Sequence, residues 1–274
     1  MDAVVSSAGD LEPIREEVDS HESTARRAEA TRVEACHAQE NGNRFVKKLL
    51  VLGAGALFWC ASALSFNPVS AQSGSWLDIV GDDGKPVANM RAPIELTREV
   101  DRLTGVNAIG SGNPDVTIVE FMDYNCPYCR KAAGELETLV RGVPGLRVKF
   151  VQNAITSPQS EQAARVNLAA FRVSGSRLAY LLHQRLYARR GVNDKKAALA
   201  LAAEIGLDPA LLDTLSEEPE ITDVLTRHMQ LSASLGLNGT PSFLINGMII
   251  IGYPGPETMR RMVDSVIRCD ALVC

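Results

Sequence analysis

The feature that most constrains the fold of this chain is a β-rich apolar run that leads directly into two closely spaced cysteines. Residues 116–122 are β-branched or apolar except for Glu120. A nearly continuous run of this kind is typical of a strand that is covered on both faces of a sheet. Only three residues separate it from Cys126-Pro127-Tyr128-Cys129. We therefore expect the two cysteines to lie just beyond the end of a buried strand.

A helix is predicted to start at this cysteine pair. Pro127 suits the first turn of a helix, where no backbone N–H is needed. Residues 146–151 then predict a second strand, and the strand–helix–strand order implies a right-handed parallel crossover. The apolar positions expected on one side of the helix are Ala132, Leu136, Leu139 and Val140.

The remainder of the chain alternates between helical and β patterns. Residues 160–235 are predicted to be helical throughout, which makes them an insertion. Strands return at 242–245 and 248–251, joined by an Asn246-Gly247 hairpin turn. A final amphipathic helix covers 257–267. The fold class predicted is α/β, a single domain interrupted by a helical insertion.

The boundaries of that domain are predicted at residues 114–268, followed by a short tail at 269–274. Residues 72–113 combine turn signals with one short helical candidate near Leu96–Leu103. We expect this segment to form an N-terminal arm rather than a domain.

Residues 46–71 are predicted to be a signal peptide. Lys47–Lys48 precede an uncharged apolar run at 49–66, and the small residues Val69 and Ala71 favour cleavage after Ala71. The alternative is an uncleaved membrane anchor, for which the run is near the lower limit of length. Export predicts a periplasmic location in either case.

The first 45 residues precede that signal and are rich in Glu, Arg, Ala and Ser. They are either a disordered extension or a mis-called start, with translation beginning at Val46. The formal net charge of −5 and the lack of a basic patch argue against a nucleic-acid partner.

The chemistry expected at the cysteine pair is thiol–disulfide exchange. At the amino end of a helix, free backbone N–H groups and the helix dipole stabilise the Cys126 thiolate. Such placement lowers a thiol pKa from about 8.5 to roughly 3.5–7.5. Cys129, one turn further in, can resolve a mixed disulfide.

Two other interpretations of the pair are open. A zinc site would need two more ligands, and Cys269 and Cys274 fit poorly in spacing. An inert structural disulfide is the other, although so short a loop is strained and reducible. We predict no metal and no cofactor. Cys269 and Cys274 are expected to form a terminal disulfide, to stay free thiols, or to act as a second redox relay.

Two motifs in the chain resemble those of a known family. Residues 119–129, Val-Glu-Phe-Met-Asp-Tyr-Asn-Cys-Pro-Tyr-Cys, look like the active-site segment of the DsbA-like branch of the thioredoxin superfamily. Residues 239–243, Gly-Thr-Pro-Ser-Phe, are similar to that family's cis-proline loop. The resemblance covers about 113–268 and implies a thioredoxin-like fold with an inserted helical subdomain.

The resemblance also implies roles for individual residues. Pro241, if cis, would face the cysteine pair and leave the Thr240 backbone free to pair with a bound peptide. Glu120 falls where the superfamily keeps a buried acid, and it would carry the proton of Cys129. The alternative for Glu120 is a side chain that merely reaches a polar pocket.

The function expected is exchange of disulfides with exported proteins through Cys126 and Cys129, as an oxidant recharged by an unidentified membrane redox partner. The Pro127-Tyr128 dipeptide would tune the site. One alternative is a disulfide isomerase or reductase of oligomeric type, with residues 72–113 as the oligomerising arm. The other is a non-catalytic cell-envelope binding protein.

Overall fold

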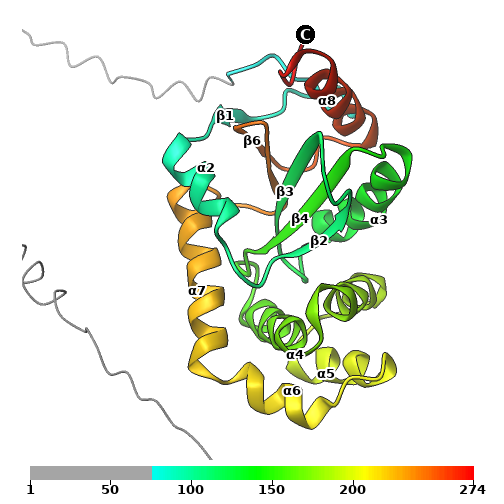
Figure 1. The fold of residues 1–274 in the computed structure, drawn as a ribbon, viewed down its shortest axis with the longest axis vertical. Helices are drawn as coiled ribbons and strands as arrows, with labels where there is room; N and C mark the ends of the chain where they lie inside the picture. The colour runs from blue at the N-terminus through cyan, green and yellow to red at the C-terminus, as the bar shows by residue number, and fades with distance from the viewer. Residues whose placement is uncertain (1–75) are drawn as a thin grey trace, which may run out of the picture. The chain divides into compact units, whose positions relative to one another are not determined.

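A computed structural model of the chain describes residues 76–274, in which a mixed six-stranded sheet carries helices on both faces (Figure 1). The strand order is β1-β6-β5-β3-β4-β2. The strands are β1 (Asn89–Arg91), β2 (Asn107–Gly110), β3 (Val116–Met122), β4 (Leu146–Gln152), β5 (Ser242–Ile245) and β6 (Met248–Ile251).

The strand predicted before the cysteines is β3, and it lies in the interior of the sheet. It pairs parallel with β4 and antiparallel with β5. Six of its seven residues are buried, as expected of a strand covered on both faces. The parallel β3–α3–β4 crossover and the β5–β6 hairpin are both confirmed.

Two hydrophobic clusters cover the two faces of the sheet. On one face, Ile118 and Met122 pack with residues of α3, α4 and α8. On the other face, Val119 and Phe121 pack with Val100 of α2 and Leu231 of α7. The helices are α2 (Ile94–Asp101), α3 (Pro127–Gly142), α4 (Pro158–Ala188), α5 (Lys195–Glu204), α6 (Pro209–Ser216), α7 (Pro219–Ser234) and α8 (Pro256–Cys269).

The predicted helical insertion consists of α4 to α7, which leave the sheet after β4 and return at β5 (Figure 1). Gly175 interrupts α4 with a positive φ of 72°, a conformation that glycine adopts without strain. Asp208 is the N-cap residue of α6, and its side chain accepts the backbone N–H groups of Ala210 and Leu211.

The segment expected to be an arm belongs largely to the domain. β1 pairs antiparallel with β6 and β2 pairs antiparallel with β4, so residues 89–110 supply both edges of the sheet. Asp82 lies further towards the amino end, and its carboxylate accepts the N–H groups of Glu257 and Thr258 at the start of α8. The predicted boundary at residue 114 is therefore corrected: the sheet starts at Asn89.

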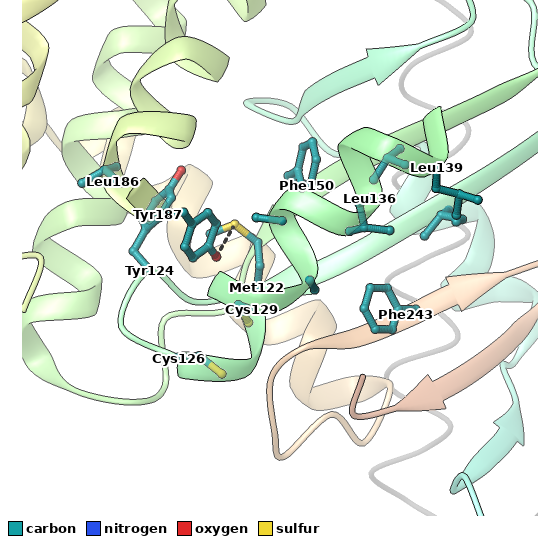
Figure 2. Close-up of a cluster of buried hydrophobic side chains, with 14 of the residues drawn as sticks. Met122, Tyr124, Cys126, Cys129, Leu136, Leu139, Phe150, Leu186, Tyr187 and Phe243 are labelled. Atoms are coloured by element: carbon teal, nitrogen blue, oxygen red, sulfur yellow. Dashed lines mark hydrogen bonds between the residues drawn. The ribbon is translucent and has the colours of Figure 1, made fainter. Parts of the chain in front are cut away.

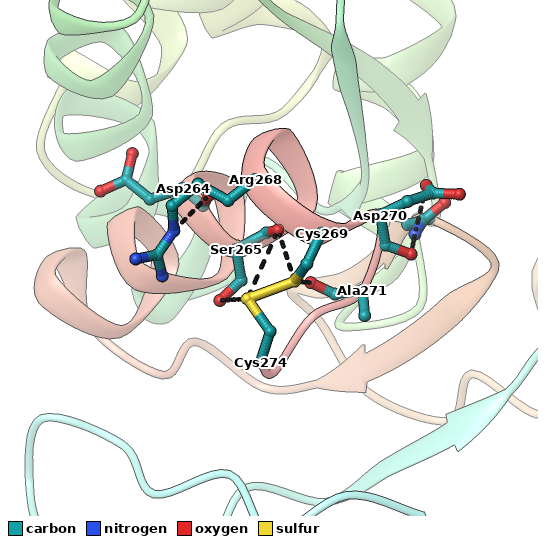
Figure 3. The surroundings of a disulfide bond; sticks show 8 residues. Asp264, Ser265, Arg268, Cys269, Asp270, Ala271 and Cys274 are labelled. Carbon is teal, nitrogen blue, oxygen red and sulfur yellow. Dashed lines mark hydrogen bonds between the residues drawn. A yellow bond between two sulfur atoms is a disulfide. The ribbon is translucent and has the colours of Figure 1, made fainter.

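Cys269 and Cys274 form a disulfide at the end of α8 (Figure 3). The bond closes a loop in which Leu272 is buried under α8. We expect the double variant Cys269→Ser, Cys274→Ser to lower the free energy of unfolding by about 2 kcal/mol, because the loop spans few residues. Its rate of disulfide exchange should stay unchanged. Chemical denaturation and an exchange assay check both expectations, and a large loss of exchange would show that this bond takes part in the reaction.

The predicted signal peptide at 46–71, the alternative start at Val46 and the extension before it lie outside the described residues. In residues 76–274, no helix is both long enough and apolar enough to cross a membrane.

Candidate active site

The cysteine pair lies where β3 turns into α3, at the amino end of the helix (Figure 2). Cys126 is the N-cap residue and Pro127 occupies the first turn. Both cysteines are free thiols in this structure. Cys126 keeps 5% of its surface exposed whereas Cys129 has none. A client can therefore reach the first sulfur but not the second.

The surroundings of Cys126 stabilise its thiolate. The Cys129 thiol donates a hydrogen bond to the Cys126 sulfur and, against the opposing effect of burial, the pKa of Cys126 falls to about 6. The Thr240 side chain and the backbone N–H groups of Cys129 and Tyr128 contribute to this lowering of the pKa. Most of Cys126 is consequently ionised at neutral pH.

Cys129 is affected in the opposite direction. Burial raises the pKa of its thiol far above the ordinary value, and its hydrogen bond to Cys126 and the charge of Glu120 raise that pKa further. Cys129 therefore keeps its proton while Cys126 is ionised. The two sulfurs are thus suited to different steps, attack by Cys126 and resolution by Cys129.

Glu120 is fully buried in β3, and neither carboxyl oxygen has a hydrogen-bond partner among residues 76–274. Burial raises the pKa of this carboxyl to about 8, with a further contribution from the charge of Cys126. A carboxyl with a pKa near neutral can both accept and give a proton at physiological pH. The structure thus places an acid–base group that is electrostatically coupled to both cysteines.

The loop at residues 239–243 leads into β5 and contacts the cysteine pair. The Thr240–Pro241 peptide bond is cis. The Cys126 thiol donates to the Thr240 carbonyl oxygen, with an Sγ···O distance of 3.0 Å. That bond favours the protonated thiol, whereas the Thr240 side chain favours the thiolate, and the net pKa stays low.

Asp123 organises the turn between β3 and Cys126. Its carboxylate accepts the N–H groups of Asn125 at 2.7 Å and of Thr156 at 2.8 Å. Its carbonyl oxygen accepts the Cys126 N–H and the Tyr187 hydroxyl, each at 3.1 Å. Asp123 is not among the site residues predicted from the sequence. An aspartate that bonds the N–H two residues later is a known turn signal and would have indicated it.

An aromatic cluster lies between the active-site turn and α4 (Figure 2). Tyr124 and Tyr187 pack with ring centroids 5.3 Å apart, and the Tyr187 hydroxyl lies 3.6 Å from the Met122 sulfur. The His183 ring contacts Phe150 at 4.5 Å and Tyr187 at 4.9 Å. These contacts join α4 of the helical insertion to β4 and to the end of β3, just before the cysteine pair.

His183 should make the protein sensitive to acid. Burial lowers the pKa of His183 from 6.5 to about 3, so the folded state keeps a neutral ring. The unfolded state takes up a proton below pH 6.5, and the free energy of unfolding therefore falls as the pH drops from 6.5 towards 3, by at most about 5 kcal/mol. His183→Phe keeps an aromatic ring and removes the titration.

The measurement is the difference in unfolding free energy between His183→Phe and the wild type across this pH range. Taking the difference removes the contributions of other titrating groups. The variant should gain relative stability steadily as the pH falls, and two parallel curves would contradict the expectation.

The active-site dipeptide is exposed, and 64% of the Tyr128 surface is accessible. Tyr128 can therefore contact a client directly. No cluster of three or more His, Cys, Asp or Glu side chains in residues 76–274 is arranged to hold a metal ion.

A thioredoxin-like sheet with a helical insertion and an unequal cysteine pair at a helix amino end defines a thiol–disulfide oxidoreductase of the thioredoxin superfamily. Residues 104–265 match the family model described as Thioredoxin, which is more than half of the chain. The chain belongs to this family.

Three solved structures with this fold match the chain over nearly their whole length. A thioredoxin-like oxidoreductase from Silicibacter pomeroyi DSS-3 is 34% identical, with 60% of this chain and 94% of that chain covered and a TM-score of 0.56. A periplasmic thioredoxin-like protein from Salmonella enterica serovar Typhimurium is 24% identical, with coverages of 65% and 99% and a TM-score of 0.58. The thiol-disulfide exchange protein alpha-DsbA2 from Wolbachia pipientis is 20% identical, with coverages of 63% and 94% and a TM-score of 0.57.

A curated relative, the Na(+)/H(+) antiporter NhaA of Herminiimonas arsenicoxydans, is 23% identical over 185 residues. The match covers 66% of this chain and 28% of that protein, so the chain spans less than a third of the length of this relative.

Proposed function

We propose that this chain exchanges disulfides with exported client proteins through Cys126 and Cys129, as an oxidant that an unidentified membrane redox partner recharges. The observation that carries the proposal is that the two cysteines differ in exposure and in thiol pKa. Cys126 is slightly exposed with a pKa near 6, and Cys129 is buried with a raised pKa. A structural disulfide or an adhesion module does not need two cysteines that differ in this way.

In the oxidising direction the reaction starts from the Cys126–Cys129 disulfide. A client thiolate attacks the Cys126 sulfur, the bond between the two cysteines breaks, and Cys129 leaves and takes up a proton. A second client thiolate then attacks the client sulfur of the mixed disulfide, and Cys126 leaves as a thiolate. The client gains one disulfide and the pair gains two electrons. The low pKa of Cys126 favours this direction, because a stable thiolate is a good leaving group.

Glu120 is the group we assign to the proton of Cys129. The Cys126 thiolate contributes to the raised pKa of Glu120. In the mixed disulfide Cys126 carries no charge, so that contribution disappears and the carboxyl ionises more readily. In the reducing direction, this is the state in which Cys129 must lose its proton, and the carboxylate is then available to accept it.

The cis-proline loop is the binding edge that we assign to the client. The Thr240 N–H has no hydrogen-bond partner among residues 76–274, whereas the Pro241 carbonyl already accepts the Gly252 N–H. An extended client segment can therefore pair with Thr240 in the manner of an added strand. Such pairing would place a client cysteine beside Cys126.

The reduction potential distinguishes the possible directions of exchange. A pKa near 6 lies between about 7 for thioredoxin and about 3.5 for DsbA. We therefore expect a potential between about −270 and −120 mV, measured by equilibrium with glutathione buffers. A potential at or below about −270 mV would contradict the assignment as an oxidant, and efficient rescue of a scrambled client would favour an isomerase. A protein inert in all these assays would support the binding interpretation.

A periplasmic location is the remaining part of the proposal. It is supported by the predicted signal peptide at 46–71 and by the likeness to a periplasmic thioredoxin-like protein of Salmonella. Mass spectrometry of the periplasmic fraction should find a mature chain that begins at Gln72. Recovery of the chain only from membranes, with Leu49 to Phe66 retained, would favour an anchor instead.

A further inference from the structure

The turn that carries Cys126 is bonded to the helical insertion by two asparagines that lie 68 residues apart in sequence. Asn125 immediately precedes Cys126, and Asn193 lies in the loop between α4 and α5. The Asn193 N–H donates to Asn125 Oδ1 at 2.7 Å, and Asn125 Nδ2 donates to the Asn193 carbonyl at 3.0 Å. The carboxamide of Asn125 therefore pairs with the backbone of Asn193 on both sides, as a neighbouring strand would.

The side chain of Asn193 also bonds to the active-site turn. Asn193 Nδ2 donates to the Tyr124 carbonyl at 2.9 Å and to the Leu186 carbonyl at 3.1 Å. Asn193 is fully buried. Asn125 Nδ2 also donates to Ser160 Oγ at 3.1 Å. We call this set of side-chain and backbone bonds between residues 124–125 and Asn193 the asparagine clamp.

The clamp acts on the backbone next to the reactive sulfur. The partners of Cys126 come from three separate parts of the fold: the Asp123 carbonyl in the turn, the N–H groups of the first turn of α3, and Thr240 in the cis-proline loop. Hydrogen bonds to sulfur weaken when the donor and acceptor move out of line. The position of residues 124–125 therefore sets where Cys126 lies relative to all of these partners.

We propose that Asn125 and Asn193 are positioning residues for Cys126, through which the helical insertion sets the reactivity of the nucleophile. The inference rests on the exchange function proposed above and deepens it by naming the part of the fold that controls the site. This role also explains why an asparagine stands at position 125, because only an amide supplies both the acceptor and the donor that the backbone of Asn193 requires. An aspartate at position 125 would lack the donor.

The test compares Asn125→Ala and Asn193→Ala with a matched control, Asn107→Ala. Asn107 is also buried and also joins the sheet to the insertion, through Asn167 Oδ1 at 2.9 Å, but it lies on β2 and not in the active-site turn. The rate of alkylation of Cys126 is measured from pH 4 to 10 on reduced protein without any client, together with the melting temperature of each variant.

We expect all three variants to melt earlier, but only the two clamp variants to change the alkylation profile. Their profiles should shift to higher pH by about one unit, which slows alkylation at pH 5 by about tenfold because the thiolate fraction falls tenfold. Clamp variants that melt earlier but keep the wild-type profile would overturn the inference, since their role would then be structural only.

The outcomes separate this inference from the proposed function. The wild-type profile alone reports whether Cys126 is an activated thiol, and the variants report only whether the clamp activates it. If Asn193→Ala does not fold, Asn193→Ser keeps a polar hydroxyl in the buried site and should give a shift in the same direction. An unshifted profile for a folded Asn193→Ser and Asn125→Ala would also overturn the inference.

Discussion

Protein that carries Cys129→Ala and retains Cys126 is expected to accumulate covalent mixed disulfides with its clients. Cys126 keeps its exposure, its contact with Thr240 and the N–H groups of α3, so attack still takes place. No second thiol is then available to release the bound client. Non-reducing gels of exported protein should show adducts that reductant removes, and turnover should fall by orders of magnitude.

The matched control is Cys126→Ala, in which the buried Cys129 is the remaining thiol of the pair. With no exposed surface and a raised pKa, Cys129 should form no adducts. Both variants are best made in the Cys269→Ser, Cys274→Ser background, so that the terminal cysteines contribute no adducts. Equal trapping by the two variants would contradict the division of roles between the sulfurs.

Substituting Glu120 with Gln is expected to stabilise the protein at high pH and to slow the step in which Cys129 reacts. The folded-state pKa of about 8 lies above the ordinary value of 4.5. Below pH 4.5 the carboxyl is protonated in both states, so it contributes nothing to the pH dependence of stability. As the pH rises from 4.5 to 8, only the unfolded state ionises, and the free energy of unfolding falls by at most about 5 kcal/mol.

Glu120→Gln removes this loss, so its advantage over the wild type should grow from pH 4.5 to 8 and then level off. Denaturation of the oxidised protein, in which no Cys126 thiolate is present, isolates the effect of burial. In stopped-flow exchange, attack by Cys126 should persist while resolution slows. A variant with unchanged resolution would remove Glu120 from the reaction, and a pH-independent stability difference would contradict the raised pKa.

The sequence predicted those parts of the fold that are encoded by local periodicity. The buried strand at 116–122, the helical insertion and the Asn246-Gly247 hairpin each carry their signal within a few residues. β1 and β2 were not predicted, because each is short and, unlike β5 and β6, is not joined to its partner strand by a hairpin turn. Their pairing is decided by distant partners, β6 and β4, and so the local sequence of residues 72–113 predicts only an arm.

The active site likewise combines residues that local motifs reveal with residues that only the folded chain brings together. The cysteine pair, Glu120 and Pro241 belong to short motifs that can be recognised along the chain. The contacts of Asn125 with Asn193 and of Tyr124 with His183 join residues about 60 to 70 positions apart. Nothing in the local sequence of the α4–α5 loop indicates that it lies beside Cys126, so only the folded chain reveals these partners.

Whether Cys126 is an ionised, reachable sulfur at the start of α3 can be measured by alkylation of the reduced protein across a pH series. Mass spectrometry of the labelled peptide assigns the modification to Cys126 rather than Cys129. We expect the alkylation rate to rise with a midpoint near pH 6. A midpoint near the ordinary thiol value of 9, or a Cys126 that the reagent does not reach, would contradict it.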